Sequence, residues 1–142
     1  MKRTDFAKDR CPVARSVETV GDWWALLIVR DAFIGRKRFG EFQTSLGVAR
    51  NILTVRLKKL VADGVLEPVP ASDGSAFKEY ALTERGRGLL PVIAALGQWG
   101  RAGSEFKLVD RKKGKRVKLE FRSEDGRKLA PDDVRLVPAS EV

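Results

Sequence analysis

The stretch GVARNILTVRLKKLVADGVLEPVP, residues 47–70, predicts a short amphipathic helix that ends near a glycine and leads into an apolar run. Apolar residues recur in it at three- and four-residue spacing, the pattern of a helix with one buried face. They are Ile52, Leu53, Leu57, Leu60 and Val61. The opposite face holds Arg50, Asn51, Thr54, Val55, Lys58 and Lys59. Because Asn and Thr form helix less well than Glu and Lys, solubility alone does not explain this face.

The sequence before this stretch predicts three more helices, each followed by a glycine. Residues 12–20 start with Pro12, which suits the first position of a helix. Residues 23–34 are almost continuously apolar and follow the capping residue Asp22, so we expect a buried central helix. Residues 38–46 place the apolar side chains of Phe39, Phe42 and Leu46 three and four positions apart.

The sequence after the stretch predicts a hairpin and a last helix. Residues 65–70 and 77–83 are typical of strands, and the turn pair Asp73-Gly74 lies between them. Thr83 is expected to cap a long helix that reaches about Ala102 and is kinked at Pro91. Two helices joined by a tight glycine-containing turn and followed by a hairpin predict a winged helix-turn-helix, mainly α with a small β-wing.

In this fold the outer face of residues 50–59 would enter a DNA major groove. Asn51 can pair with adenine, Thr54 and Val55 can contact a thymine methyl group, and Arg50 can reach guanine or a phosphate. Cations around this face would hold the DNA backbone; they are Arg38, Lys58, Lys59 and Lys78. The alternative for the residues of this face is an ordinary solvated helix surface.

Composition narrows the class of protein. The 142 residues carry a net charge of +9, which favours a polyanionic partner, the alternative being a basic protein kept soluble by charge repulsion. With no histidine and a single cysteine, the chain offers little for metal binding or for general base catalysis, so we expect no metal, no cofactor and no enzyme.

The longest apolar run, residues 23–29, is too short for a membrane helix, and no secretory leader is seen. The cytoplasm is the expected compartment, with the protein on the nucleoid when it binds DNA.

Two stretches of the chain resemble HxlR-type transcription regulators, a MarR-related family of bacterial winged-helix proteins. They are CPVARSVETVGDWWALLIVRDAFIGRKRFGEFQTSLGVARNILTVRLKKLVADGVLEPV, residues 11–69, and KEYALTERGRGLLPVIAALGQWG, residues 78–100. The most specific pieces are the Cys11-Pro12 start, the helix from Trp24 to Asp31, Arg38-Phe39, the helix from Leu53-Thr54 to Leu57, and Tyr80-Ala81-Leu82-Thr83 before Gly86. The resemblance implies a homodimer that binds a double-stranded DNA operator through residues 50–59 and a wing at residues 65–83.

The same resemblance implies that the first and last helices form the dimer contact. The last helix also has more apolar residues than a small core can cover. The predicted contact residues are Val13, Val17, Leu89, Val92, Ile93, Leu96 and Trp99. Such a dimer would be a repressor on a near-palindromic operator, and an effector, either redox or small-molecule, is left open. The alternative function is a sequence-tolerant architectural protein that binds DNA or RNA with the basic tail.

The chain departs from the family pattern at two positions. Where many relatives begin the helix of residues 50–62 with Ser-Pro, this chain has Ala49-Arg50, which removes a side-chain cap and adds a cation. Where relatives often have an arginine near Pro68, this chain has none, so Lys78 is the remaining candidate for a wing contact.

Cys11 precedes a helix and follows Arg10, an environment that stabilises a thiolate. Several family members use a cysteine at this place as a redox sensor. The alternative is an inert residue in the dimer contact, because the chain has no second cysteine to resolve a sulfenic acid.

The domain organisation predicted from the sequence is an N-terminal arm at residues 1–10, the winged helix-turn-helix domain at 11–102, and a basic extension at 103–142. Residues 101–122 hold nine Lys or Arg against three acids. Alternation of Val117, Leu119 and Phe121 predicts a strand, the first arm of a small hairpin that turns at Asp125-Gly126 and packs on the body. The extension either reaches DNA backbone beyond the core site or is a solvated basic appendage.

Overall fold

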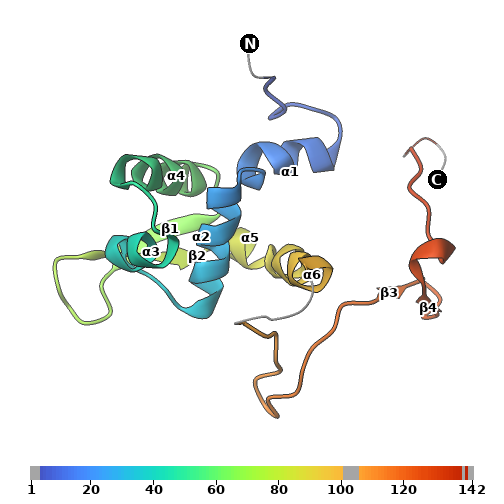
Figure 1. Ribbon diagram of the computed structural model, residues 1–142. Coiled ribbons are helices and arrows are strands. Elements are labelled where there is room, and N and C mark those ends of the chain that lie inside the picture. Colours follow the sequence, from blue (N-terminus) through green and yellow to red (C-terminus); the bar gives the residue numbers. More distant parts are fainter. Residues whose placement is uncertain (1–3, 101–105, 139, 141–142) are drawn as a thin grey trace. The chain divides into compact units, whose positions relative to one another are not determined.

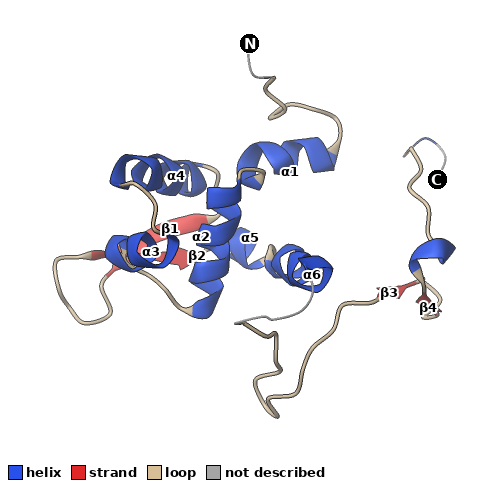
Figure 2. Ribbon diagram, in the orientation of Figure 1, coloured by secondary structure: helices blue, strands red, loops and turns tan. Residues whose placement is uncertain are grey.

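The computed structural model describes residues 4–100, 106–138 and 140. It divides the chain into two units, Met1–Ile93 and Ala94–Val142. The predicted fold class is confirmed, since the first unit is mainly helical and has one small antiparallel sheet (Figure 2). Its elements, in chain order, are α1 (Pro12–Val20), α2 (Trp23–Ile34), α3 (Phe39–Leu46), α4 (Arg50–Ala62), β1 (Leu66–Pro70), β2 (Lys78–Leu82) and α5 (Glu84–Arg87). The last helix, α6 (Leu90–Gly100), crosses from the first unit into the second.

The central element of the first unit is α2, as predicted. The Asp22 side chain caps it by accepting a hydrogen bond from the Ala25 backbone N–H at 2.9 Å, and Gly35, at φ 114°, ends it in the left-handed conformation. Ile28 and Val29 are fully buried. Figure 1 shows α2 among the other helices, and α1, α3, α4 and β2 all contact it.

The hydrophobic core gathers side chains from every element of the first unit except the short α5. The buried stripe predicted for α4 is confirmed: Leu53, Leu57 and Leu60 are buried, and Ile52 and Val61 pack against the core from its edge. The buried core residues are Val20, Ala25, Ile28, Val29, Phe42, Val48, Leu53, Leu57, Leu60, Val65 and Leu66.

The wing is the predicted hairpin. β1 and β2 pair antiparallel, with Leu66 opposite Leu82 and Pro68 opposite Tyr80. The Tyr80 N–H donates to the Lys37 carbonyl at 2.8 Å, so it points away from β1 and joins the wing to the segment before α3. Because β1 has only one neighbouring strand among the described residues, prolines are tolerated in it.

The last helix of the first unit differs from the prediction. Thr83 caps it as expected, since its Oγ1 accepts from the Gly86 N–H at 2.9 Å. A single helix kinked at Pro91 is wrong, however, because α5 and α6 are separate and break at residues 88–89. Pro91 has no N–H to donate to the Arg87 carbonyl, and its ring crowds that group, so the helix is interrupted one turn before the proline. Residues 101 and 102, which the predicted helix included, lie outside the described residues.

The second unit contains two chain reversals in the basic extension. The predicted hairpin at Asp125-Gly126 is confirmed: β3 (Phe121–Arg122) pairs antiparallel with β4 (Lys128–Leu129), and η1 (Pro131–Asp133), a 3₁₀ turn, follows. The strand expected across residues 117–121 is present only at Phe121. Val117 instead donates its N–H to the Leu108 carbonyl at 2.8 Å, in an earlier reversal. The packing of the extension on the body stays a prediction.

None of the helices in the described part of the chain is long and apolar enough to cross a lipid bilayer.

The two faces of α4 should respond differently to truncation. We expect Leu57→Ala to lower the free energy of unfolding by about 2–5 kcal/mol, because it leaves a cavity in a closely packed core. Val55→Ala, two residues away on a side chain that is 55% exposed, should change it by less than about 0.5 kcal/mol. Urea unfolding followed by circular dichroism measures both. Equal losses would contradict the assignment of the two faces.

Candidate nucleic-acid interface

The turn between α3 and α4 sets the direction of α4. Gly47 has φ 62°, a left-handed conformation that favours glycine, and its N–H donates to the Gln43 carbonyl at 2.9 Å to end α3. Val48 is buried and anchors the turn in the core. Ala49 then starts α4 with no side-chain cap, as its residue type predicted. The connection is therefore a three-residue turn that leaves the outer side of α4 uncovered within the first unit.

The exposed face of α4 presents an amide, a small apolar group and a cation. Asn51, Val55 and Lys58 follow one another at spacings of four and three, and all three are exposed. Thr54 lies half-buried beside them, and its hydroxyl donates to the Arg50 carbonyl at 2.8 Å. That hydrogen is therefore used within the helix, which leaves the Thr54 methyl group and the lone pairs of its oxygen for a ligand.

The other predicted cations of α4 already have partners. The Arg50 guanidinium lies over the Phe39 ring, 4.9 Å from its centroid, which fixes the start of α4 against α3. Lys59 forms an ion pair with Asp63 at 2.8 Å, one turn further along. Lys58 has no ion pair among the residues that the structure describes. Of these three cations, only Lys59 is paired with an acid among the described residues.

A groove lies between α3, the start of α4 and the wing. Its volume is about 940 Å³, and Arg38, Arg50 and Lys78 all line it. These three cations were predicted separately, from the segment before α3, from α4 and from β2, and the fold brings them to one concave surface. The groove is open to solvent and its walls mix aromatic, polar and cationic side chains.

Arg38 is held by the wing. Its Nη2 contacts an Asp73 carboxylate oxygen at 2.6 Å, its Nε lies 3.4 Å from a Glu79 oxygen, and its guanidinium lies over the Phe77 ring at 5.3 Å. The Asp73 hydrogen bond raises the pKa of Arg38. The sequence analysis gave Asp73 only as a turn residue and did not single out Phe77 or Glu79, so it missed the contacts of all three with Arg38. Glu79 lies on a strand of the wing and is 5% exposed, so its carboxylate is buried beside Arg38.

The two wing carboxylates are stabilised in their charged form. The backbone N–H of Ser75 and then the Arg38 side chain lower the pKa of Asp73. Glu79 accepts from the backbone N–H of Ser72 at 3.1 Å and from its hydroxyl at 3.2 Å, and these bonds, followed by Arg38, lower the pKa of Glu79. Arg38, Asp73 and Glu79 therefore form a charged network that fixes the wing loop to the start of α3.

The predicted dimer residues fall into two groups. Val13, Val17, Val92, Leu96 and Trp99 are exposed large apolar residues, with Trp99 84% exposed. Leu89 and Ile93 are half-buried and pack against the core of their own unit. Cys11 is exposed just before α1, and its backbone N–H donates to an Asp9 carboxylate oxygen at 2.8 Å. Its role as a redox sensor stays a prediction.

The order of the helices and the two-stranded wing define the fold of the first unit as a winged helix-turn-helix. Residues 19–107 match the profile of the HxlR-like helix-turn-helix family, more than half of the chain. The chain belongs to this family, which confirms the resemblance seen in its motifs. An HTH-type transcriptional regulator of Mycobacterium tuberculosis is 47% identical over 88 residues; the match covers 62% of this chain and 56% of that relative, so the chain spans little more than half of its length.

Two solved structures of proteins named as regulators or transcription factors are similar to this chain. The crystal structure of PA1607, assigned as a transcription factor, is 48% identical, with a TM-score of 0.83 over 94% of this chain and 99% of PA1607. The reduced form of the redox regulator HypR is 31% identical, with a TM-score of 0.58 over 63% of this chain and 90% of HypR. The chain thus contains an HxlR-like helix-turn-helix domain, and the relatives and solved structures that it resembles are named as transcription regulators.

The wing network should make stability depend on pH in acid. Folding lowers the pKa of both Asp73 and Glu79, so the network stabilises the fold above the ordinary carboxyl values of about 4 and loses this contribution as the pH falls through the lowered values. Glu79→Gln should therefore flatten the fall in the free energy of unfolding on acidification. Urea unfolding from about pH 7 to about pH 3 measures this. Parallel curves for parent and variant would contradict it.

Proposed function

We propose that this protein is a homodimeric, sequence-specific repressor that occupies a near-palindromic DNA operator. The observation that carries the proposal is the division of α4: Leu53, Leu57 and Leu60 are buried, whereas Asn51, Val55 and Lys58 are exposed on the other side. A helix held by its core face and preceded by a tight turn can present its outer face to a major groove. The family membership supports DNA binding.

Each exposed side chain of α4 suits one kind of contact. The Asn51 amide can donate to and accept from the edge of an adenine, and Val55 and the Thr54 methyl group can contact a thymine methyl. The Thr54 hydroxyl, which already donates to Arg50, can still accept from a base. Arg50 can reach guanine or phosphate only by leaving the Phe39 ring or by extending past it.

The remaining cations suit contacts with the DNA backbone. Lys58 and Lys78 are exposed and have no ion pair within the described part of the chain, so phosphates can neutralise them directly. Lys59 would exchange its pair with Asp63 for a phosphate. Arg38 already shares its charge with two carboxylates, so we propose that its larger contribution is to hold the wing beside the DNA.

Base contacts and backbone contacts predict different mutational effects. Asn51→Ala should weaken operator binding by about 1–3 kcal/mol and random duplex binding much less, because random sequence rarely presents the matching base. Lys58→Ala, on the same face of α4, should weaken both duplexes alike and reduce the salt slope of the binding constant by about one unit. The operator would first be selected from genomic fragments, and fluorescence anisotropy at several salt concentrations would compare both variants.

The outcome also separates the proposal from its alternative. A specific regulator should prefer the operator over random duplex by a factor of roughly 10³ or more. If Asn51→Ala and Lys58→Ala behave identically on operator and random DNA, α4 does not select bases and the protein is a sequence-tolerant architectural one.

The dimer is proposed from the exposed apolar residues of α1 and α6. Val92, Leu96 and Trp99 lie at spacings of four and three on α6, so they share one side of that helix, and all are exposed. An exposed apolar surface of this kind is typical of an interface. Two copies of α4 could then engage half-sites about 34 Å apart.

Leu96→Glu should disrupt this dimer and weaken operator binding, because a single half-site is then bound at a time. Gln98→Glu is the matched control: it adds the same charge to α6 two residues away and keeps an oxygen for the Leu119 N–H, which lies 2.6 Å from the Gln98 side chain. Light scattering at micromolar concentration gives the mass of each variant. A parent protein that is already monomeric there would overturn the dimer.

A further inference from the structure

Charge is divided unevenly in the extension. Residues 107–118, here called the basic loop, hold seven Lys or Arg and a single acid, Asp110. The seven are Lys107, Arg111, Lys112, Lys113, Lys115, Arg116 and Lys118; all are exposed, and none has an ion pair among the described residues. In the hairpin that follows, by contrast, Arg122 and Lys128 pair with Glu120, and Arg127 pairs with Asp125.

The one acid of the basic loop, Asp110, accepts hydrogen bonds from the backbone of the loop and forms no ion pair with a cation among the described residues. The Asp110 carboxylate accepts the backbone N–H of Lys113 at 2.6 Å and that of Lys115 at 2.9 Å. The Gly114 N–H closes the turn on the Asp110 carbonyl at 3.0 Å, and Gly114 adopts a φ of 65°. The Lys113 bond, followed by that of Lys115, lowers the pKa of Asp110, so it stays charged at neutral pH and the turn stays closed.

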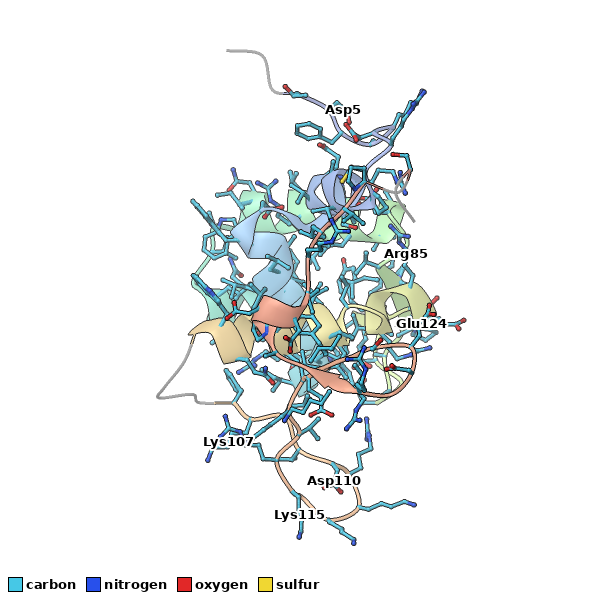
Figure 3. All side chains as sticks on the ribbon, turned by 90° about the vertical axis from the view of Figure 1, so that its right-hand side faces the viewer. Asp5, Arg85, Lys107, Asp110, Lys115 and Glu124 are labelled. Atoms are coloured by element: carbon cyan, nitrogen blue, oxygen red, sulfur yellow. The ribbon has the colours of Figure 1, made fainter. Side chains whose placement is uncertain are left out.

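The result is a folded turn with its cations directed outward. Figure 3 labels Lys107, Asp110 and Lys115 and shows both lysine side chains extending away from the ribbon. Seven like charges in twelve residues repel one another, and Asp110, the one acid among them, offsets only one of the seven. The hairpin at residues 120–128 is as polar but balances its charges, so solubility does not require such an excess.

We propose that the basic loop binds the phosphate backbone of duplex DNA outside the base pairs that α4 contacts. The inference rests on the proposed function and adds a second, sequence-independent contact to it. The chemistry of the loop favours this partner. It has no aromatic residue on which the bases of a single strand could stack, and its seven cations are Lys and Arg, the side chains that neutralise backbone phosphates, so the phosphates of a duplex are the partner that it suits best.

The test uses the full-length protein and two labelled duplexes. One is the selected operator trimmed to the shortest fully bound length, and the other carries about 10 base pairs of random sequence on each side, roughly one helical turn. The loop variant combines Lys112→Ala, Lys113→Ala and Lys115→Ala, which leaves Asp110, Gly114 and the backbone N–H groups in place. The control combines Arg122→Ala, Arg127→Ala and Lys128→Ala, which removes the same charge from residues that are already paired.

We expect the loop variant to bind the flanked duplex about tenfold more weakly than the parent near 0.1 M salt, with a salt slope reduced by up to about three units for each bound protomer. Its affinity for the trimmed operator should be unchanged, and the control should stay within about twofold on both duplexes. Unchanged affinity and slope on the flanked duplex would overturn the proposal. So would equal losses in the loop variant and the control, since net charge alone would then account for the effect.

The variant Asp110→Ala tests whether the folded turn positions the cations or whether net charge alone determines binding to DNA. This variant removes a negative charge, so a purely electrostatic attraction would bind the flanked duplex more tightly. If the turn positions the cations, binding to the flanked duplex should instead weaken. Tighter binding would overturn the role given to the turn, and preference of the basic loop for a single-stranded RNA of equal length would replace duplex DNA as its partner.

The experiment also separates this inference from the proposed function. If the protein shows no operator preference, the proposed function fails; a loss of flank-dependent binding that is confined to the loop variant would still support the loop as a duplex contact. If operator preference is present but the loop variant binds like the parent, only the present inference fails.

Discussion

The first unit depends on the burial of α2. Ile28 and Val29 have no exposed surface, and α1, α3, α4 and β2 all contact this helix. Because protein cores are closely packed, a helix that buries Leu53, Leu57 and Leu60 in the same core has little freedom to rotate. The ion pair of Arg56 with Asp22, the cap of α2, at 3.1 Å adds a polar tie between α4 and α2. The outer face of α4 is thus ordered before any ligand binds. Binding therefore does not include a free-energy cost for ordering this helix.

The wing is positioned by a different kind of interaction. Its strands form a two-stranded sheet, and such hairpins have marginal stability alone. Here the Tyr80 N–H bonds to Lys37, and Arg38 bonds to Asp73 and Glu79, so both ties meet at the residues just before α3. The arrangement uses a cation beside the groove to hold two carboxylates. These two ion pairs lower the positive potential at the proposed interface, and they fix the position of the wing.

Short-range patterns in the sequence predicted most of the fold, because helical periodicity, caps and glycine stops act over a few residues. The buried stripe of α4, the Asp22 and Thr83 caps and the turn at Gly126 all follow from such patterns. The Arg38 network did not, because its partners lie 35 and 41 residues away and no local pattern joins them. The break before α6 was misjudged for a related reason. Pro91 indicated a disturbed helix, but whether the chain bends or separates into two helices depends on the hydrogen bonds that Gly88 and Leu89 form instead.

Net charge alone does not show which surfaces of this protein carry unpaired positive charge. Much of the positive charge of the first unit is used internally: Arg30 and Arg36 pair with buried Asp31, Arg38 with the wing acids, Arg56 with Asp22 and Lys59 with Asp63. These pairs fix helices and loops, and their fields largely cancel at a distance. The cations without ion pairs in the described residues include Lys58, Lys78 and those of the basic loop. The field that a polyanion meets therefore depends on the placement of acids as much as on the number of Lys and Arg residues. In the basic loop the single acid offsets only one of the seven positive charges.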